Sequence, residues 1–380
     1  MIFKNFLNIK KNKIIKKDLL NLLKKDPKIF ETLKTNYKYS YSKKIISKYK
    51  KFSNIRVIGM GGSVLGTEAI YYFLKSKIKK KFTFVNNLNS NADYFNDKNI
   101  NLNLIISKSG NTLETIANAN TLIKDKDSNI VITENKDSYL TDLAKKLKAE
   151  IFEHKNYVGG RYSVLSEVGM LPAELMNLNE NKFKQFNNLI KNKNFINNLV
   201  NNVAATLNLI KGGKNTSVIL NYDEKSENLF KWYQQLIAES LGKKSKGILP
   251  IISSMPKDNH SLMQLYLDGP KKNFYTFFNV LDNRMIELNN RSIISSHKYL
   301  KNQSIEKIKQ SQMLATEKVF RFKKLPFRSF RILKRDEKSL GELFCFFILE
   351  TILLGRALNV NPFDQPSVEL IKIETKKILT

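Results

Sequence analysis

The chain has 380 residues, 42% of them hydrophobic, a formal net charge of +31 and a single cysteine, Cys345. This length accommodates two domains of ordinary size, and one cysteine excludes a disulfide within the chain, which favours a reducing compartment. Such a charge is typical of nucleic-acid-binding proteins, but the lysines are spread along the chain and their clusters lack interleaved aromatic residues. We therefore expect no nucleic-acid partner, while the positive field would attract a small phosphorylated substrate.

The N-terminal segment is basic, and its apolar residues are interrupted by Lys and Asn, so it lacks the apolar core of a signal peptide. The most apolar segment, residues 343–358, carries Glu350 and Arg356 and is too short to span a bilayer. We expect a cytoplasmic protein with no membrane partner.

Beyond this arm, short apolar runs alternate with helix-length segments. The runs predict buried strands at residues 55–59, 82–86, 102–107, 129–134, 216–222, 247–253, 274–280 and 327–333. Helices are predicted between them, for example at residues 67–75, 113–124, 139–148 and 228–242, and a last long helix at 338–358. Strands separated by helices predict an α/β fold of two doubly wound units with mainly parallel sheets.

The alternation stops near residues 190–212 and then starts again, which divides the chain into parts. We expect a helical N-terminal arm (1–45), a first α/β domain with the phosphate-binding loops (46–190) and a second α/β domain with the catalytic Glu and His (191–337). A C-terminal helix and tail (338–380) would contribute to the active site.

The first strand leads into a glycine-rich turn, GMGGSVLG, at residues 59–66. A dinucleotide-binding turn needs a third glycine where Val64 stands, and a carboxylate after the next strand, where Asn86 and Asn87 stand. The turn therefore favours a smaller anion, beside the alternative that its glycines only let a helix pack close to a strand.

The third strand leads into a hydroxyl-rich turn within LIISKSGNTLETI, residues 104–116. Ser107, Ser109 and Thr112 supply hydroxyls, Gly110 permits a tight turn, and Lys108 adds a positive charge. Hydroxyls and free amides at a helix N-terminus are typical of a site for a phosphate monoester. The alternative is an ordinary helix cap shared by Thr112 and Glu114, but a cap needs only one hydroxyl. We predict a phosphate site, with the glycine turn, including Gly62 and Ser63, as its neighbouring wall.

These two turns resemble the sugar isomerase fold, and later segments resemble the glucose-6-phosphate isomerase family, also called phosphoglucose isomerase. The later segments are GGRYSVLSEVGMLPAEL (159–175), QLIAESLGKK (235–244), DNHSLMQLYLDGP (258–270) and FDQPSVELIK (363–372). The motifs follow the family's order from residue 59 to 372. The resemblance implies two sugar-isomerase-type domains of three αβα layers, with helical N- and C-terminal extensions. It also implies an isomerase of glycolysis and gluconeogenesis that interconverts an aldose phosphate and a ketose phosphate through a cis-enediolate.

Roles follow from the resemblance where the residues match. Glu239 corresponds to the base that moves a proton between C1 and C2, and Arg161 to the residue that stabilises the enediolate. His260 resembles the ring-opening histidine and Lys372 the lysine that assists it, while Gln365 resembles a substrate contact. Without the resemblance, Glu239 would be interpreted as a solvated helix residue and Lys372 as a surface lysine.

The sequence departs from the family pattern at several positions. Leu241 replaces an Asn in the ESNGK motif, and Pro366, Ser367 and Ile371 alter the C-terminal motif. These changes bear on loop geometry and substrate fit, since every catalytic position is kept.

The alternatives are a dual phosphoglucose/phosphomannose isomerase and a non-catalytic sugar-phosphate-binding regulator. The FDQ…VE…K ending argues against the first, and the joint presence of the four catalytic residue types argues against the second. The three histidines, His154, His260 and His297, are widely separated, so we expect no metal and no cofactor. The expected partners are a small phosphosugar substrate and a second copy of the chain, in a homodimer that shares its active site.

Overall fold

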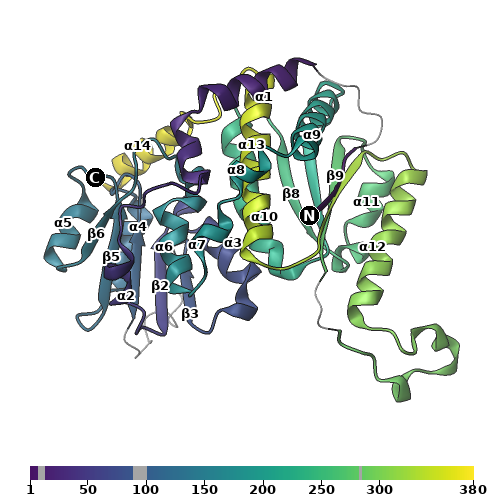
Figure 1. Cartoon of the computed structure of the whole chain (residues 1–380), viewed down its shortest axis with the longest axis horizontal. Helices are drawn as coiled ribbons and strands as arrows, with labels where there is room; N and C mark the ends of the chain where they lie inside the picture. The colour runs from purple at the N-terminus through teal and green to yellow at the C-terminus, as the bar shows by residue number, and fades with distance from the viewer. Residues whose placement is uncertain (7–12, 89–100, 282–284) are drawn as a thin grey trace.

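The computed structural model describes residues 1–6, 13–88, 101–281 and 285–380, and its strands form two five-stranded sheets (Figure 1). The first sheet has the order β3-β2-β4-β5-β6 and all of its pairs are parallel. Its strands are β2 (Asn54–Gly59), β3 (Lys81–Val85), β4 (Leu102–Ile106), β5 (Ser128–Thr133) and β6 (Glu150–Glu153). The second sheet has the order β1-β10-β9-β7-β8 and is parallel except where β1 pairs antiparallel with β10. Its strands are β1 (Ile2–Lys4), β7 (Thr216–Asn221), β8 (Leu249–Ser254), β9 (Asn273–Val280) and β10 (Phe327–Ile332).

All eight predicted strands are confirmed, and two strands were not predicted. β6 has the sequence EIFE, with a carboxylate at each end and Ile151 exposed, so it lacks the apolar run of a buried strand. β1 has three residues and begins the arm that was predicted to be helical; it is a strand because β10 offers it a free sheet edge. Residues 7–12 of the arm lie outside the described residues.

Helices cover both faces of each sheet (Figure 1). In the first half of the chain they are α1 (Lys13–Lys25), α2 (Lys43–Ser47), α3 (Leu65–Phe73), α4 (Leu113–Leu122), α5 (Tyr139–Lys146), α6 (Glu167–Leu175), α7 (Glu180–Phe183) and α8 (Phe186–Leu189). In the second half they are α9 (Lys193–Lys211), α10 (Glu227–Leu241), α11 (Met263–Asp268), α12 (Ile305–Phe322), α13 (Glu337–Ala357) and α14 (Val368–Leu379). The predicted helices at 67–75, 113–124, 139–148, 228–242 and 338–358 are confirmed within a few residues.

The layers follow from where the apolar side chains lie. All five residues of β4 are buried, as expected for a parallel strand covered on both faces. One cluster of buried residues lies under α4 and α5, and another lies between the second sheet and α11 and α12. A third cluster extends from the first sheet across α10 and α13 to the second sheet, so the two sheets share a continuous core.

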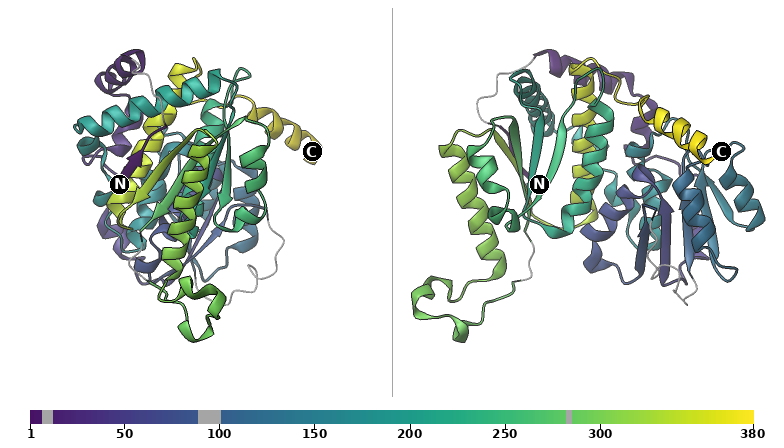
Figure 2. Two further views of the ribbon diagram at one scale, coloured as in Figure 1. Left: turned by 90° about the vertical axis from the view of Figure 1, so that its right-hand side faces the viewer. Right: turned by 180° about the vertical axis from the view of Figure 1, so that it is seen from behind.

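The contact between the two sheets runs through helices rather than through strands. α10 packs against α3 and α13, and α13 packs against α7, which places α10 and α13 between the sheets (Figure 1). Seen from behind, residues 285–304 extend away from the second sheet ahead of α12 (Figure 2). Among the described residues, no helix is both long enough and apolar enough to cross a membrane.

Candidate active site

The glycine turn after β2 is packed tightly between two other segments. A Cβ on Gly62 would lie 2.2 Å from the Gly160 carbonyl oxygen and 2.6 Å from the Arg161 nitrogen, so only glycine fits there. Gly61 has φ +52° and faces the amide of Gln235 on α10. Ser63 lies half-buried at the end of this turn. The turn thus joins the first sheet to the segment of Arg161 and to α10.

The hydroxyl turn after β4 lies beside it, because β2 and β4 are neighbours in the sheet. This is the point where the strand order reverses, and ligands of doubly wound folds bind at the carboxyl ends of the strands at such a point. The glycine turn and the hydroxyl turn therefore lie side by side at the carboxyl ends of β2 and β4.

Within this second turn the hydroxyls do not act as an ordinary helix cap. Thr112 is the N-cap residue of α4 but makes no side-chain cap hydrogen bond; its Oγ1 lies 2.9 Å from Ser107 Oγ. The capping interpretation is therefore wrong, and the first amides of α4 receive no side-chain cap from Thr112. Ser109 is exposed, and Gly110 has φ +71°.

Lys108 lies at the rim of the same turn. Its Nζ donates to the Asn156 carbonyl at 2.7 Å and lies 3.7 Å from Glu134. Partial burial lowers the pKa of Lys108, and the Glu134 carboxylate opposes that shift. A phosphate would have to compete with these partners for the ammonium.

Arg161 and Glu239 form the central pair of the candidate site. Arg161 is 2% exposed, and its Nη1 lies 3.2 Å from Glu239 Oε2. The Glu239 side chain is 24% exposed, so the carboxylate remains accessible in front of a buried guanidinium. A carboxylate can move a proton, and a fixed guanidinium can stabilise an oxyanion next to it.

The rest of the Arg161 guanidinium binds residues 361–365, which we call the linking segment because they connect α13 to α14. Nη1 donates to Gln365 Oε1 at 2.5 Å, and Nη2 donates to the carbonyls of Pro362 at 2.7 Å and Asp364 at 3.0 Å. Nε donates to Ser240 Oγ at 2.8 Å. The Arg161 side chain therefore binds two segments that are distant in sequence, the end of α10 and the linking segment.

Neither His260 nor Lys372 makes a hydrogen bond or ion pair with Arg161 or Glu239 within the described residues. His260 ends the short 3-10 helix Lys257–His260, is exposed, and its imidazole makes no hydrogen bond with any described residue. Lys372 lies on α14, is 60% exposed, and pairs with Glu369 of the same helix. In this single chain the predicted site is therefore assembled around Arg161, Glu239 and Gln365.

Sequence analysis missed several residues that complete the site. Ser240 Oγ accepts from Arg161 and lies 2.9 Å from the Tyr162 hydroxyl, which also donates to the Pro362 carbonyl. Lys243 Nζ lies 3.0 Å from Asp364 Oδ1. All three are direct or near neighbours of Arg161 and Glu239 in the quoted motifs, which is the signal that could have identified them.

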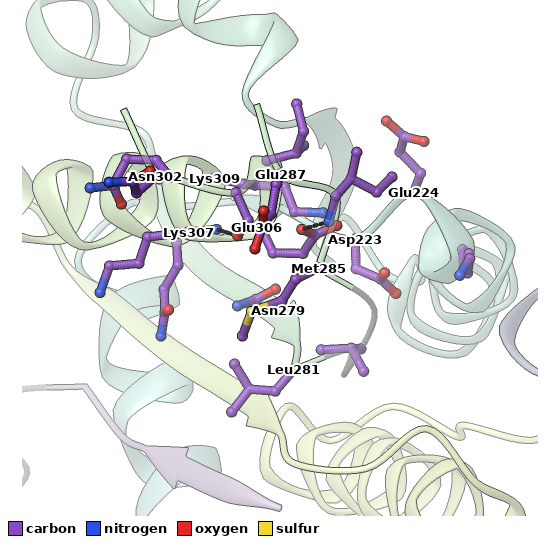
Figure 3. A pocket seen from close by; sticks show the side chains of 17 residues that line it. Asp223, Glu224, Asn279, Leu281, Met285, Glu287, Asn302, Glu306, Lys307 and Lys309 are labelled. Atoms are coloured by element: carbon purple, nitrogen blue, oxygen red, sulfur yellow. Dashed lines mark hydrogen bonds between the residues drawn. The ribbon is translucent and has the colours of Figure 1, made fainter. Parts of the chain in front are cut away.

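A cavity of about 1040 Å³ lies elsewhere, beyond the carboxyl ends of β7 and β9 (Figure 3). Its lining includes Asp223, Asn279, Leu281 and Glu306, and none of the predicted site residues. Asp223 is already bound by Arg335 at 2.6 Å. The candidate site around Arg161 and Glu239 therefore lies outside this cavity. No group of three His, Cys, Asp or Glu side chains suited to a metal ion occurs within residues 1–6, 13–88, 101–281 and 285–380.

Comparison with known proteins places the chain in a family. A family model described as phosphoglucose isomerase matches residues 7–254. The chain belongs to the phosphoglucose isomerase family. The glucose-6-phosphate isomerase of Methanocaldococcus jannaschii is 34% identical over 352 residues, which cover 88% of this chain and 86% of that protein. The enzyme of the same name from Mycoplasmopsis pulmonis is 32% identical over 352 residues, covering 85% and 82%.

Solved structures resemble the chain in its fold. A hypothetical protein from Thermus thermophilus matches with a TM-score of 0.83 and 22% identity, covering 97% of this chain and 94% of that one. A glucose-6-phosphate isomerase from Chlamydia trachomatis matches with a TM-score of 0.70 and 20% identity, covering 88% and 71%. At these identities the likeness concerns the fold, and it confirms the predicted α/β class with mainly parallel sheets.

Proposed function

We propose that this member of the phosphoglucose isomerase family interconverts glucose 6-phosphate and fructose 6-phosphate. The observation that carries the proposal is the buried Arg161 guanidinium 3.2 Å from the accessible Glu239 carboxylate, with the backbone of Gly160 and Arg161 packed against Gly62 of the glycine turn. The proposed substrate is taken from the relatives, which are named glucose-6-phosphate isomerase.

The proposed reaction moves one proton within the sugar. Glu239 takes the proton from C2 of the open-chain aldose, the C2–H electrons form a C1=C2 double bond, and the C1 carbonyl oxygen becomes the enediolate oxygen. Arg161 stabilises that charge. The O2 proton passes to O1, the C2 carbonyl forms, and Glu239 returns its proton to C1, so that atoms and charge balance.

The hydroxyl turn would hold the phosphate throughout. Ser107, Ser109 and Thr112, the Lys108 ammonium, and Gly62 and Ser63 of the glycine turn supply donors at the edge where β2 and β4 end. A phosphate held there is bound equally in the ground and transition states, so it positions the sugar without lowering the barrier of the proton transfer.

Opening of the sugar ring would use His260 and Lys372, which in the described part of the chain are not bonded to Arg161, Glu239 or Gln365. We propose that the active form is a homodimer in which His260 enters the partner's site, and that Lys372 assists from α14. The exposure of both side chains supports this, because each is accessible to another surface.

The test is a coupled assay that follows glucose 6-phosphate formed from fructose 6-phosphate, with and without EDTA. We expect turnover that EDTA leaves unchanged. Absence of turnover would reject the isomerase and favour a sugar-phosphate-binding regulator. Turnover of mannose 6-phosphate at a comparable rate would identify a dual phosphoglucose/phosphomannose isomerase instead.

A further inference from the structure

The linking segment, residues 361–365, is irregular backbone that side chains from elsewhere hold in place. Arg161 binds it at two carbonyls and at Gln365, and the Tyr162 hydroxyl donates to the Pro362 carbonyl at 3.0 Å. The orientation of the guanidinium toward Glu239 thus depends on where this segment lies.

Lys243 holds the same segment through different groups. Its Nζ forms an ion pair with Asp364 Oδ1 at 3.0 Å and donates to the Asn361 carbonyl at 2.5 Å. It also donates to the Ser240 carbonyl at 3.1 Å, which ties it to the end of α10, the helix of Glu239. The Lys243 side chain is 11% exposed, while its partners Asp364 and Asn361 lie at the surface.

Asp364 is the acidic partner of Lys243 in the linking segment. Its carboxylate also accepts from Asn361 Nδ2 at 2.9 Å, and the hydrogen bond from Lys243 is the first cause that lowers the pKa of Asp364. The Asp364 side chain is 51% exposed, so removing Lys243 would leave it hydrated rather than buried without a partner. Removing Lys243 would therefore change the position of the linking segment and leave the packing of the core intact.

We propose that Lys243 is a positioning residue for the isomerisation, which holds the linking segment so that Arg161 keeps its Nη1 directed at Glu239. The inference rests on the proposed function. Lys243 makes no hydrogen bond or ion pair with Arg161 or Glu239 in the described structure; it binds the Asn361 carbonyl and the Asp364 carboxylate, next to the Pro362 and Asp364 carbonyls that Arg161 binds.

The experiment measures kcat and KM for fructose 6-phosphate in Lys243→Met, Lys243→Arg and a control, Lys246→Met. Lys246 lies in the same loop and donates to the Leu358 carbonyl at 2.8 Å, outside the linking segment. We expect Lys243→Met to lower kcat about tenfold with KM within about twofold, because misplacing a transition-state group affects turnover more than binding. Lys243→Arg should recover most of that loss, and Lys246→Met should stay within about twofold of wild type.

Two further variants separate positioning from general stability. Asp364→Asn removes the ion pair by changing its more exposed partner. It should lower kcat by less than Lys243→Met does, because the Asn361 carbonyl still accepts a hydrogen bond from Lys243. Adding Lys243→Met to Arg161→Lys should cost no more than about a further twofold, because a residue that acts through Arg161 has little left to lose.

The outcomes are distinct. An unchanged kcat in Lys243→Met, or losses that multiply in the double variant, would overturn the role of Lys243 while leaving the isomerase in place. A wild-type chain without isomerase activity would instead reject the proposed function and the inference with it.

Discussion

Arg161 and Glu239 divide the proposed chemistry between a buried cation and an accessible carboxylate. Arg161 has its donors committed to Glu239, Ser240, Gln365 and two backbone carbonyls, so the guanidinium cannot rotate without breaking several hydrogen bonds. Such preorganised donors stabilise developing charge without reorganising during the reaction. Glu239 has fewer restraints, which suits a group that must reach two neighbouring carbon atoms.

The first prediction concerns the base. Glu239→Gln keeps the shape of the side chain but cannot accept a proton, so kcat should fall by ~10²–10⁴-fold, as is typical when a general base is removed. Binding of fructose 6-phosphate, measured by calorimetry, should persist. Turnover close to wild type would assign the proton transfer to another group.

The second prediction concerns the phosphate. Ser109 is exposed and its Oγ accepts only a local hydrogen bond from the Asn111 amide at 3.2 Å, so it is available to a ligand. Ser109→Ala should raise KM for fructose 6-phosphate several-fold with kcat within about twofold, since a phosphate contact is made equally in the ground and transition states. A fall in kcat at constant KM would contradict this role.

Among the elements, the short helix α7 is followed by a buried lysine that donates hydrogen bonds to two other segments. Lys184, which follows α7, donates through Nζ to the carbonyls of Thr32 and Leu165 and lies 5.0 and 5.1 Å from the rings of Tyr37 and Tyr39. Burial lowers the pKa of Lys184 to about 7. The lysine thus joins the N-terminal arm to the segment that follows Arg161.

The third prediction is a pH dependence of stability. The unfolded chain holds the Lys184 proton up to its ordinary pKa of 10.5 and the native chain releases it near pH 7, so stability rises with pH between these values. The rise is at most ~1.4 kcal/mol per pH unit. The free energy of unfolding from urea titrations at pH 7, 8 and 9 should show this rise in wild type, and Lys184→Met should lose it.

Lys182→Met is the matched control, because Lys182 lies on α7, two residues before Lys184, and its side chain is exposed. It should retain the wild-type slope. A difference between wild type and Lys184→Met that stays constant with pH would show that Lys184 remains charged in the native chain.

At the scale of the whole molecule, we propose that a second chain completes the site. His260 and Lys372 are exposed, and within the described residues neither is bonded to the pair that they are proposed to assist. A two-fold dimer is the commonest closed assembly, and in it each chain can lend a loop to the other. This is why we propose that His260 works in trans.

The fourth prediction tests that assembly. His260→Ala and Glu239→Gln chains should each be inactive, and mixing them should restore up to about a quarter of wild-type activity, since half of the dimers are hybrids with one intact pocket. Native mass spectrometry would verify the exchange of subunits. Confirmed exchange without recovered activity would place His260 in its own chain's site.

The sequence by itself determined the eight apolar strands and the two turns. Both depend on local patterns: a run of apolar residues predicts a strand that is covered on both faces, and Gly110, with φ +71°, permits a turn that other residues rarely adopt. The same locality explains the failure at β1 and β6, whose short, charged sequences form strands only because an existing sheet edge accepts them.

Only the tertiary structure decided which of the predicted site residues meet. Arg161, Glu239 and Gln365 are far apart in the chain, and their contact follows from the packing of α10 against α3 and from the path of the linking segment. The positions of Lys243 and of the Pro362 and Asp364 carbonyls follow from the same packing. The physical reason is that a hydrogen bond over such a separation is set by how whole elements pack, which local sequence patterns do not encode.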